Sequence, residues 1–136
     1  MSITSKNEAR KLMTADFDSQ WAGVTPIKWQ NQKFDPPENQ AWVSYYIRWS
    51  TGDQETLGPD NNRKFLITGR VYIDVRTPIF DSMKNSDILV DRAENIYRGK
   101  RLGSIDFYEV LSTEIGEDGQ WFLTSVSAGF QYIVIK

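Results

Sequence analysis

The sequence contains neither cysteine nor histidine. Without cysteine there is no disulfide, no thiolate nucleophile and no iron–sulfur cluster, and nearly all structural zinc sites are excluded. Without histidine there is no Ser-His-Asp arrangement, no imidazole ligand for a metal, and no side chain whose ordinary pKa lies near neutrality. Catalysis would have to use carboxylates, lysine, tyrosine or a bound cofactor. These absences predict a protein that is not an enzyme and holds no metal and no cofactor.

Long apolar runs and an excess of basic charge are also missing. No segment approaches the roughly 18 to 20 consecutive apolar residues of a membrane-spanning helix, and the N-terminus lacks the apolar stretch of a secretory signal. The formal net charge is −2, whereas duplex-binding domains depend on clustered Lys and Arg. The length of 136 residues fits one domain. We therefore expect a soluble single domain, residues 1–136, that acts inside a cell without a membrane or nucleic acid as its tight partner.

Two segments have the periodicity of amphipathic helices. Ser5 and Glu8 form a capping box, and apolar residues then recur at steps of three and four from residue 9 to Trp21. The second stripe runs from Leu89 to Tyr97, and Gly99 is the expected stop. Such stripes usually face a sheet, so we expect both helices to pack against a common core.

Five further segments have the alternation or composition of strands. They are residues 25–30, 41–50, 64–78, 105–116 and 120–136. The last two are separated by the Gly-bounded stretch 116–119, which is typical of a hairpin turn. The order of helix, strands, helix and strands predicts an α+β fold. It should contain a mostly antiparallel β-sheet of about five strands, with two α-helices packed on one face.

The only candidates for acid–base or metal chemistry are carboxylates on the two helices. Asp87, Asp91 and Glu94 follow one another at steps of four and three, which places them on one side of the second helix. Asp16 and Asp18 belong to the first helix. A solvent-facing role explains both groups better than a catalytic pair or a metal site, because the carboxylates alternate with the apolar stripes.

Aromatic residues make up 13% of the chain, including five Trp. In the segment 41–50, Trp42 and Tyr46 share one face of the expected strand, while Tyr45 and Trp49 share the other. The two faces cannot be equally buried. Three interpretations remain open: core packing, a protein interface, and a platform on which sugars or bases stack.

Short motifs follow one another in a fixed order from the end of the first helix to the last strand. They are Trp21, the N-x-x-F-x-P-P segment from Asn31 to Pro37, Trp42-Val-Ser-Tyr45, Leu57-Gly58, Thr68-Gly69-Arg70-Val71, Thr77-Pro78 and Gly129-Phe130-Gln131-Tyr132. This order resembles the tail terminator family of long-tailed bacteriophages, also called minor tail or tail completion proteins. The sequence departs from the family after Pro78, where Ile79 to Met83 stand in place of a Gly-rich turn.

The resemblance implies a structural virion protein. Such a protein caps the head-proximal end of the tail tube, terminates its polymerisation and forms part of the head–tail joining interface as a ring, a hexamer in this family. Its implied partners are copies of itself, the tail tube protein and the head–tail connector protein, with DNA only as passing cargo. Its implied location is the virion tail, after assembly in the host cytoplasm. The alternatives are a head–tail connector or stopper component, and an aromatic-rich module that binds a glycan or another small ligand.

A subunit of a closed ring needs two complementary surfaces for the adjacent subunits. It needs further surfaces for the proteins above and below the ring along the tail axis. The two adjacent prolines at 36 and 37 fix their φ angles, so this segment would lose little entropy on docking. The loop from residue 51 to 62 is the second candidate, and the aromatic strand the third. The expected partner-interface residues are therefore Phe34, Asp35, Pro36, Pro37, Trp42, Tyr46 and Leu57.

Overall fold

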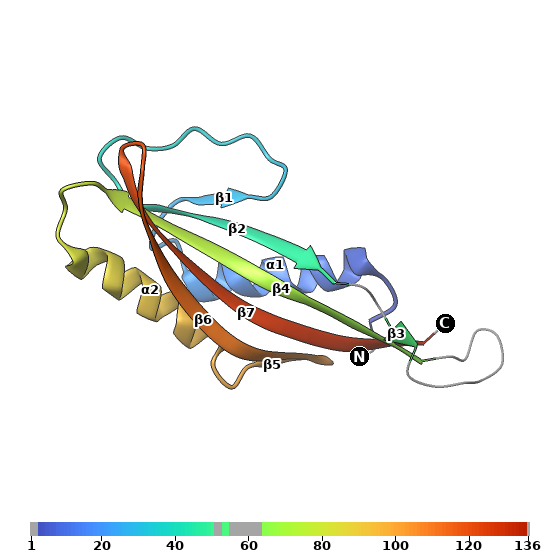
Figure 1. Ribbon diagram of the computed structural model, residues 1–136. Helices are drawn as coiled ribbons and strands as arrows, with labels where there is room; N and C mark the ends of the chain where they lie inside the picture. The colour runs from blue at the N-terminus through green and yellow to red at the C-terminus, as the bar shows by residue number, and fades with distance from the viewer. Residues whose placement is uncertain (1–2, 51–52, 55–63, 136) are drawn as a thin grey trace.

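A single twisted sheet organises the chain, as the computed structural model shows for residues 3–50, 53–54 and 64–135 (Figure 1). In chain order the helices and strands are α1 (Lys6–Trp21), β1 (Ile27–Trp29), β2 (Trp42–Trp49), β3 (Asp53–Gln54), β4 (Lys64–Pro78), α2 (Met83–Tyr97), β5 (Arg101–Leu102), β6 (Ile105–Asp118) and β7 (Trp121–Ile135). Across the sheet the order is β1-β2-β4-β7-β6-β5, and β3 pairs with β4 beside this path.

The α+β class, the two helices and the mostly antiparallel sheet are confirmed. The expected number of strands, five, is wrong, because β3 and β5 also join the sheet. Each has only two residues, which is too short to show an alternating pattern in the sequence. The sheet is also not wholly antiparallel, since β1 runs parallel to β2, with Ile27 opposite Val43. The last turn is tighter than expected, because β6 continues to Asp118 before the chain reverses.

Helix α1 begins and ends much as its sequence predicts. Ser5 is the N-cap, and its hydroxyl oxygen accepts a hydrogen bond from the backbone N–H of Glu8 at 3.1 Å. The helix ends at Trp21, where Ala22 adopts a left-handed conformation with φ of 54°. The buried face consists of Ala9, Met13, Phe17 and Trp21.

Both helices cover the same face of the sheet (Figure 1). The core beneath them combines the α1 face with side chains of α2 and of strands β2, β4, β6 and β7. Phe17 stacks on Tyr45 of β2 with ring centroids 4.7 Å apart, and on Trp21 at 5.4 Å. No helix of the described residues covers the opposite face of the sheet, on which the Phe34 ring packs against Trp42 (Figure 1).

Polar contacts join α1 to α2 and to the turn that follows α2. The Arg92 guanidinium donates hydrogen bonds to the backbone carbonyls of Gln20 and Trp21, each at 3.1 Å, and so satisfies the end of α1. Lys100 forms an ion pair with Asp16 at 3.0 Å, and both side chains are largely buried. The expectation that Asp16 faces solvent is therefore wrong. Sequence could not reveal this pair, because the chain between the two residues must fold before they meet.

Two tyrosine hydroxyls inside the core should make stability fall at high pH. Burial raises the pKa of Tyr45 and of Tyr97, whose hydroxyls lie near one another without a hydrogen bond of normal geometry. The folded state therefore holds these protons more tightly than the unfolded chain, in which the pKa is about 10. This contribution to stability is complete below pH of about 10 and is lost as the pH rises further.

We expect Tyr97→Phe to reduce this alkaline loss of stability, with little change at neutral pH, because the lost hydroxyl has no partner there. Urea unfolding curves at neutral pH and above pH 10 measure the effect. Tyr108→Phe is the matched control, since the Tyr108 side chain is exposed. Equal alkaline destabilisation of the parent protein and of Tyr97→Phe would contradict the explanation.

Candidate functional site

The segment with the two prolines is anchored on the face of the sheet that carries no helix. The Phe34 ring lies 5.0 Å from the Trp42 ring, measured between centroids. Trp42 also contacts Trp121 edge to face at 5.8 Å, and the Arg76 guanidinium lies over its ring at 4.8 Å. Together these neighbours leave the Trp42 side chain only 5% exposed. Trp42 therefore holds the segment in place and does not itself present an open surface.

Asp35 and Pro36 are exposed beside this anchor, and Pro37 is partly buried. Of the expected interface residues, the structure brings Phe34 and Trp42 into contact, and the two prolines follow Phe34 in the same segment. Their role in binding a partner stays a prediction. Leu57 lies outside the described residues.

Tyr46 belongs to a separate cluster further along β2. It stacks on Tyr72 of β4, with centroids 5.0 Å apart and an interplanar angle of 9°, and Arg48 lies over the ring at 5.5 Å. Its hydroxyl donates to Asp74 at 3.4 Å. Partial burial, followed by the negative charge of Asp74, raises the pKa of Tyr46. Contacts with Tyr72, Arg48 and Asp74 hold the Tyr46 side chain in place. Tyr46 and Trp42 therefore belong to two separate aromatic clusters.

Trp49 is covered as well. Lys6 and Arg10 place their cationic groups 5.2 Å and 4.6 Å from the centroid of its ring, and its indole N–H donates to the Tyr132 hydroxyl at 3.2 Å. Trp42, Tyr46 and Trp49 therefore do not form one exposed row of rings. A row of that kind is what a stacking platform for sugars or bases requires.

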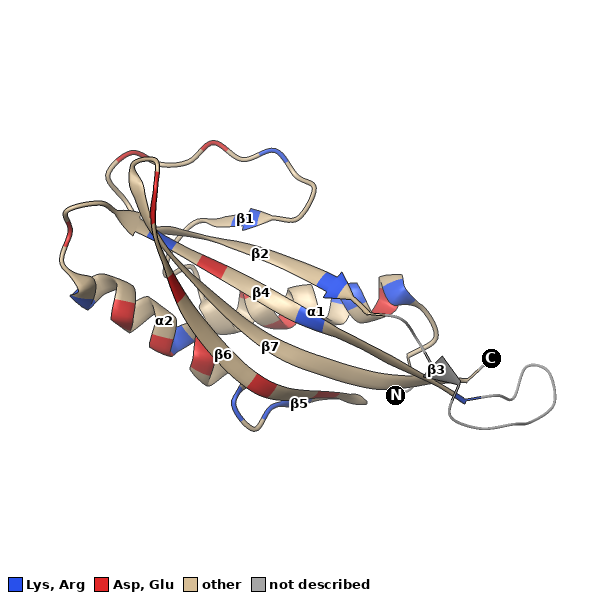
Figure 2. Ribbon diagram, in the orientation of Figure 1, with Lys and Arg blue, Asp and Glu red and all other residues tan. Residues whose placement is uncertain are grey.

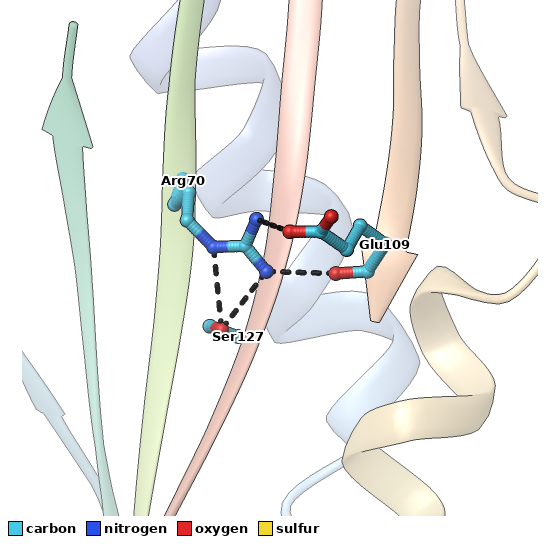
Figure 3. A network of polar contacts seen from close by, with 3 residues as sticks. All are labelled: Arg70, Glu109 and Ser127. Carbon is cyan, nitrogen blue, oxygen red and sulfur yellow. Dashed lines mark hydrogen bonds and ion pairs between the residues drawn. The ribbon is translucent and has the colours of Figure 1, made fainter. Parts of the chain in front are cut away.

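Arg70 ties three strands together on the face without helices (Figure 3). From β4 it reaches across β7, where Ser127 accepts hydrogen bonds from its Nε and Nη2 at 3.3 and 3.0 Å. It then meets Glu109 of β6, whose carboxylate and backbone carbonyl accept bonds at 2.9 and 2.7 Å. Glu109 has a φ of 49° and lies in a bulge between Tyr108 and Leu111. Arg70 thus fixes the bulge, which bends β6 along its length.

Beyond this bulge, β6 is a long strand with one edge unpaired. β5 pairs only with Ile105 and Asp106, and no other described strand lies on that side of β6. The side chains along this edge are mostly exposed, including Leu111 at 50% and Ile115 at 58%. An open edge of this kind offers backbone donors and acceptors to another chain.

At the opposite edge of the sheet, the backbone groups of β2 have hydrogen-bond partners. β1 pairs with the first part of β2, and further along the Gln30 side chain takes the place of a strand. Its amide oxygen accepts from the backbone N–H of Ile47 at 3.1 Å, and its amide nitrogen donates to the carbonyl of Ile47 at 3.4 Å. The open backbone edge is therefore much longer at β6 than at β2.

A groove of about 370 Å³ runs between α2 and this part of β6. Asp87, Asp91 and Glu94 of α2 line one side, with Glu114 of β6 opposite. Asp87 and Asp91 are exposed, as expected from their spacing. The same expectation is wrong for Glu94, whose side chain is only 13% exposed and pairs with Arg98 at 3.3 Å. Within residues 3–50, 53–54 and 64–135, no group of three or more His, Cys, Asp or Glu residues is arranged to hold a metal ion.

Comparison with known proteins supports the fold and adds no function. No family model matches the sequence, and no curated protein matches it either. Among 22 similar chains of solved structures is one whose name carries no functional description. It has a TM-score of 0.64 and 17% identity, over 90% of this chain and 94% of that one. Shared architecture is what this likeness establishes. In addition, none of the helices described is both long enough and apolar enough to cross a membrane.

Sequence reasoning missed Gln30, Arg70 and the bulge at Glu109. Gln30 gave no signal, because its position on the β2 edge depends on how the chain folds back after β1. The bulge had a weak signal, since the apolar alternation of β6 is interrupted after Tyr108. Arg70 shares the interior of β4 with two other charged residues, Asp74 and Arg76, so its charge alone did not single it out.

Proposed function

We propose that this protein is a tail terminator subunit, which caps the head-proximal end of a phage tail tube and stops its growth. In this proposal the chain works as a ring of identical subunits. It contacts the tube protein on one side and the head–tail connector on the other, while DNA passes through without binding. No step of covalent chemistry is required of the chain.

Support for the proposal comes from the way in which the motifs of the resemblance contact one another. The rings of Phe34 and Trp42, from two different motifs, contact each other with their planes tilted by 35°. Gly69 and Phe130, from two others, are opposite each other in β4 and β7, and the Phe130 ring occupies the space of the missing Gly69 side chain. Because motifs that are separate in the sequence contact one another in the fold, they act together to define a single arrangement of the sheet. This mutual contact is the observation that carries the proposal.

The surfaces are suited to assembly. The segment from Asp35 to Pro37 is held on a buried anchor, so it is already shaped before a partner arrives. The β6 edge offers unpaired backbone groups and exposed apolar side chains. The alternative of a glycan- or small-ligand-binding module has no observation in its favour, because its candidate rings are covered by neighbouring side chains.

Labelling of assembled particles tests the proposed position. Phage tails carrying a tagged copy of this chain can be decorated with gold and viewed by negative-stain electron microscopy, with a tagged tube protein as the control for access. We expect label at the head-proximal end of tails, including tails not yet joined to heads. Label that appears only on heads would instead identify a connector or stopper component and contradict the proposal.

A further inference from the structure

Acidic residues mark β6 near one edge of the sheet, and a basic residue marks β1 at the other edge (Figure 2). No Lys or Arg occurs between Leu102 and Ile135, and β6 is marked only by acidic residues. Glu114 and Glu117 form no ion pair within the described part of the chain. On the β1 side, Lys11 and Lys28 are exposed and equally without an acidic partner among the described residues.

We propose that the β6 edge of one copy docks on the α1–β1 side of a second copy, so that neighbouring copies join head to tail. This inference rests on the proposed ring and names the surfaces that close it. The acidic surface is defined by the β6 edge and the groove beside it, with Asp87, Asp91, Glu114 and Glu117. The basic surface is defined by Arg10, Lys11 and Lys28.

The backbone of β6 provides the first argument. From Tyr108 to Asp118 it pairs only with β7, so one set of N–H and C=O groups points outward along this stretch. β1 is the outermost strand at the other end of the sheet, and no described strand lies beyond it. Pairing β6 with β1 of the next copy would continue the sheet from subunit to subunit. Because β1 has only three residues, side chains must supply much of the contact.

Charge argues against pairing of β6 with a second β6. In an antiparallel pair related by a twofold axis, residues of one strand face residues of the same strand in the partner. Since β6 has acidic residues and no basic ones, no register can place a cation opposite an acid. A register centred on Thr113 would even place Glu109 opposite Glu117. Like charges directly opposite one another destabilise a sheet, so a basic partner is favoured.

Each of the two surfaces contains a hollow beside its strand. Between α1 and β1 lies a cleft of about 480 Å³, and its lining includes Arg10, Lys11 and the partly buried Trp29, with Asp18 as its one acidic residue. The acidic groove beside β6 contains Thr124, which is 3% exposed and whose hydroxyl makes no hydrogen bond. A lysine ammonium that entered the groove would donate to this hydroxyl and meet the carboxylates at once.

Exposed apolar side chains flank the acidic surface. Leu111 and Ile115 of β6 are about half exposed, as is Ile88 of α2. Ile88 of α2 lies on the same, helix-covered side of the sheet as the cleft beside Trp29, and its burial there would contribute hydrophobic free energy that charge alone does not supply. Because the two surfaces lie at opposite ends of one sheet, their contact is repeated by rotation and not by a twofold exchange, which is how rings close.

Charge reversal tests the inference through the mass of the protein in solution, measured by sedimentation velocity across a range of concentrations. We expect the parent protein to form a species larger than a dimer, which weakens as salt is raised. E114K/E117K and K11E/K28E should each weaken assembly by at least about tenfold. Combining all four substitutions should restore it, because the opposite charges then face one another again.

D81K is the matched control for the single variant E114K, since each changes the net charge by the same amount and Asp81 is an exposed residue of the connection between β4 and α2. It should leave assembly unchanged. Thermal unfolding of each variant establishes that it folds. A monomeric parent protein, an equal effect of the control, or failure of the combined variant to recover would overturn the inference.

Amide hydrogen exchange separates strand pairing from contact between side chains. Assembly should slow exchange along residues 108–118 and around β1, relative to E114K/E117K at the same concentration. Unchanged exchange at β6 in the assembled protein would overturn the proposed edge pairing. Assembly by these surfaces without any arrest of tube growth would support the inference and contradict the terminator proposal. The two can therefore fail separately.

Discussion

Trp21→Ala is expected to lower the free energy of unfolding by about 3–5 kcal/mol. The Trp21 side chain is fully buried where α1, α2 and the sheet meet. It stacks on Phe17, its indole N–H donates to the Thr25 hydroxyl at 3.0 Å, and the Arg92 guanidinium lies 5.7 Å from its ring centroid. Alanine would leave a cavity and remove the surface on which Arg92 rests. The melting temperature should fall by about 10 °C or more.

Trp21→Phe separates the contribution of ring packing from that of the hydrogen bond to Thr25, because it keeps an aromatic ring and removes the indole N–H. We expect a clearly smaller loss for this variant. Val24→Ala is the control for truncation of a side chain that is 46% exposed, and it should change stability by less than about 0.5 kcal/mol. Chemical unfolding followed by tryptophan fluorescence and circular dichroism measures all three. Similar losses in Trp21→Ala and Val24→Ala would contradict the packing described here.

Gly69→Val is expected to destabilise the protein by about 3 kcal/mol or to prevent folding. A Cβ atom at Gly69 would lie 2.5 Å from the backbone oxygen of Arg48 and 2.6 Å from Cζ of Phe130. The first neighbour is main chain of the adjacent strand, so it cannot move aside without loss of β2–β4 pairing. The second is a fully buried ring that also contacts Trp49, with centroids 5.7 Å apart.

Thr68→Ala is the matched control for Gly69→Val, because it changes the preceding residue of the same strand without adding volume. It should cost much less. A second variant, Gly69→Val with Phe130→Ala, tests the reason for the effect. Relief should be incomplete, since the clash with the carbonyl of Arg48 remains. Unfolding free energies of the four proteins measure the pattern, and a Gly69→Val protein as stable as the parent would contradict it.

The sequence predicted those features that depend on local periodicity. The α1 stripe from Ala9 to Trp21, the N-cap at Ser5, and the long strands β2, β4 and β7 all follow from residue spacing and turn chemistry. Gly69 was visible in the sequence as part of the Thr68-Gly69-Arg70-Val71 motif. Its reason was not, because the Phe130 ring that fills the space comes from a strand far along the chain.

The candidate surfaces were less accessible to sequence reasoning. Alternation within β2 placed Trp42 and Tyr46 on one face, but it could not show that Phe34 and Trp121 cover the first ring while Tyr72 stacks on the second. Likewise, no local pattern distinguishes an edge strand from a central one. The strand order alone reveals that one edge of β6 is open. Once that edge is known, the acidic residues beside it can be interpreted as part of a docking surface.

The length of tail tubes tests the central claim most directly. Tube protein encoded by the same phage can be polymerised with and without this protein, and tube lengths measured by negative-stain electron microscopy. If the chain is a terminator, its addition should arrest growth, shorten the distribution in proportion to its concentration and place a ring at one end of each tube. Unchanged tube lengths and bare ends at saturating concentrations would contradict the account.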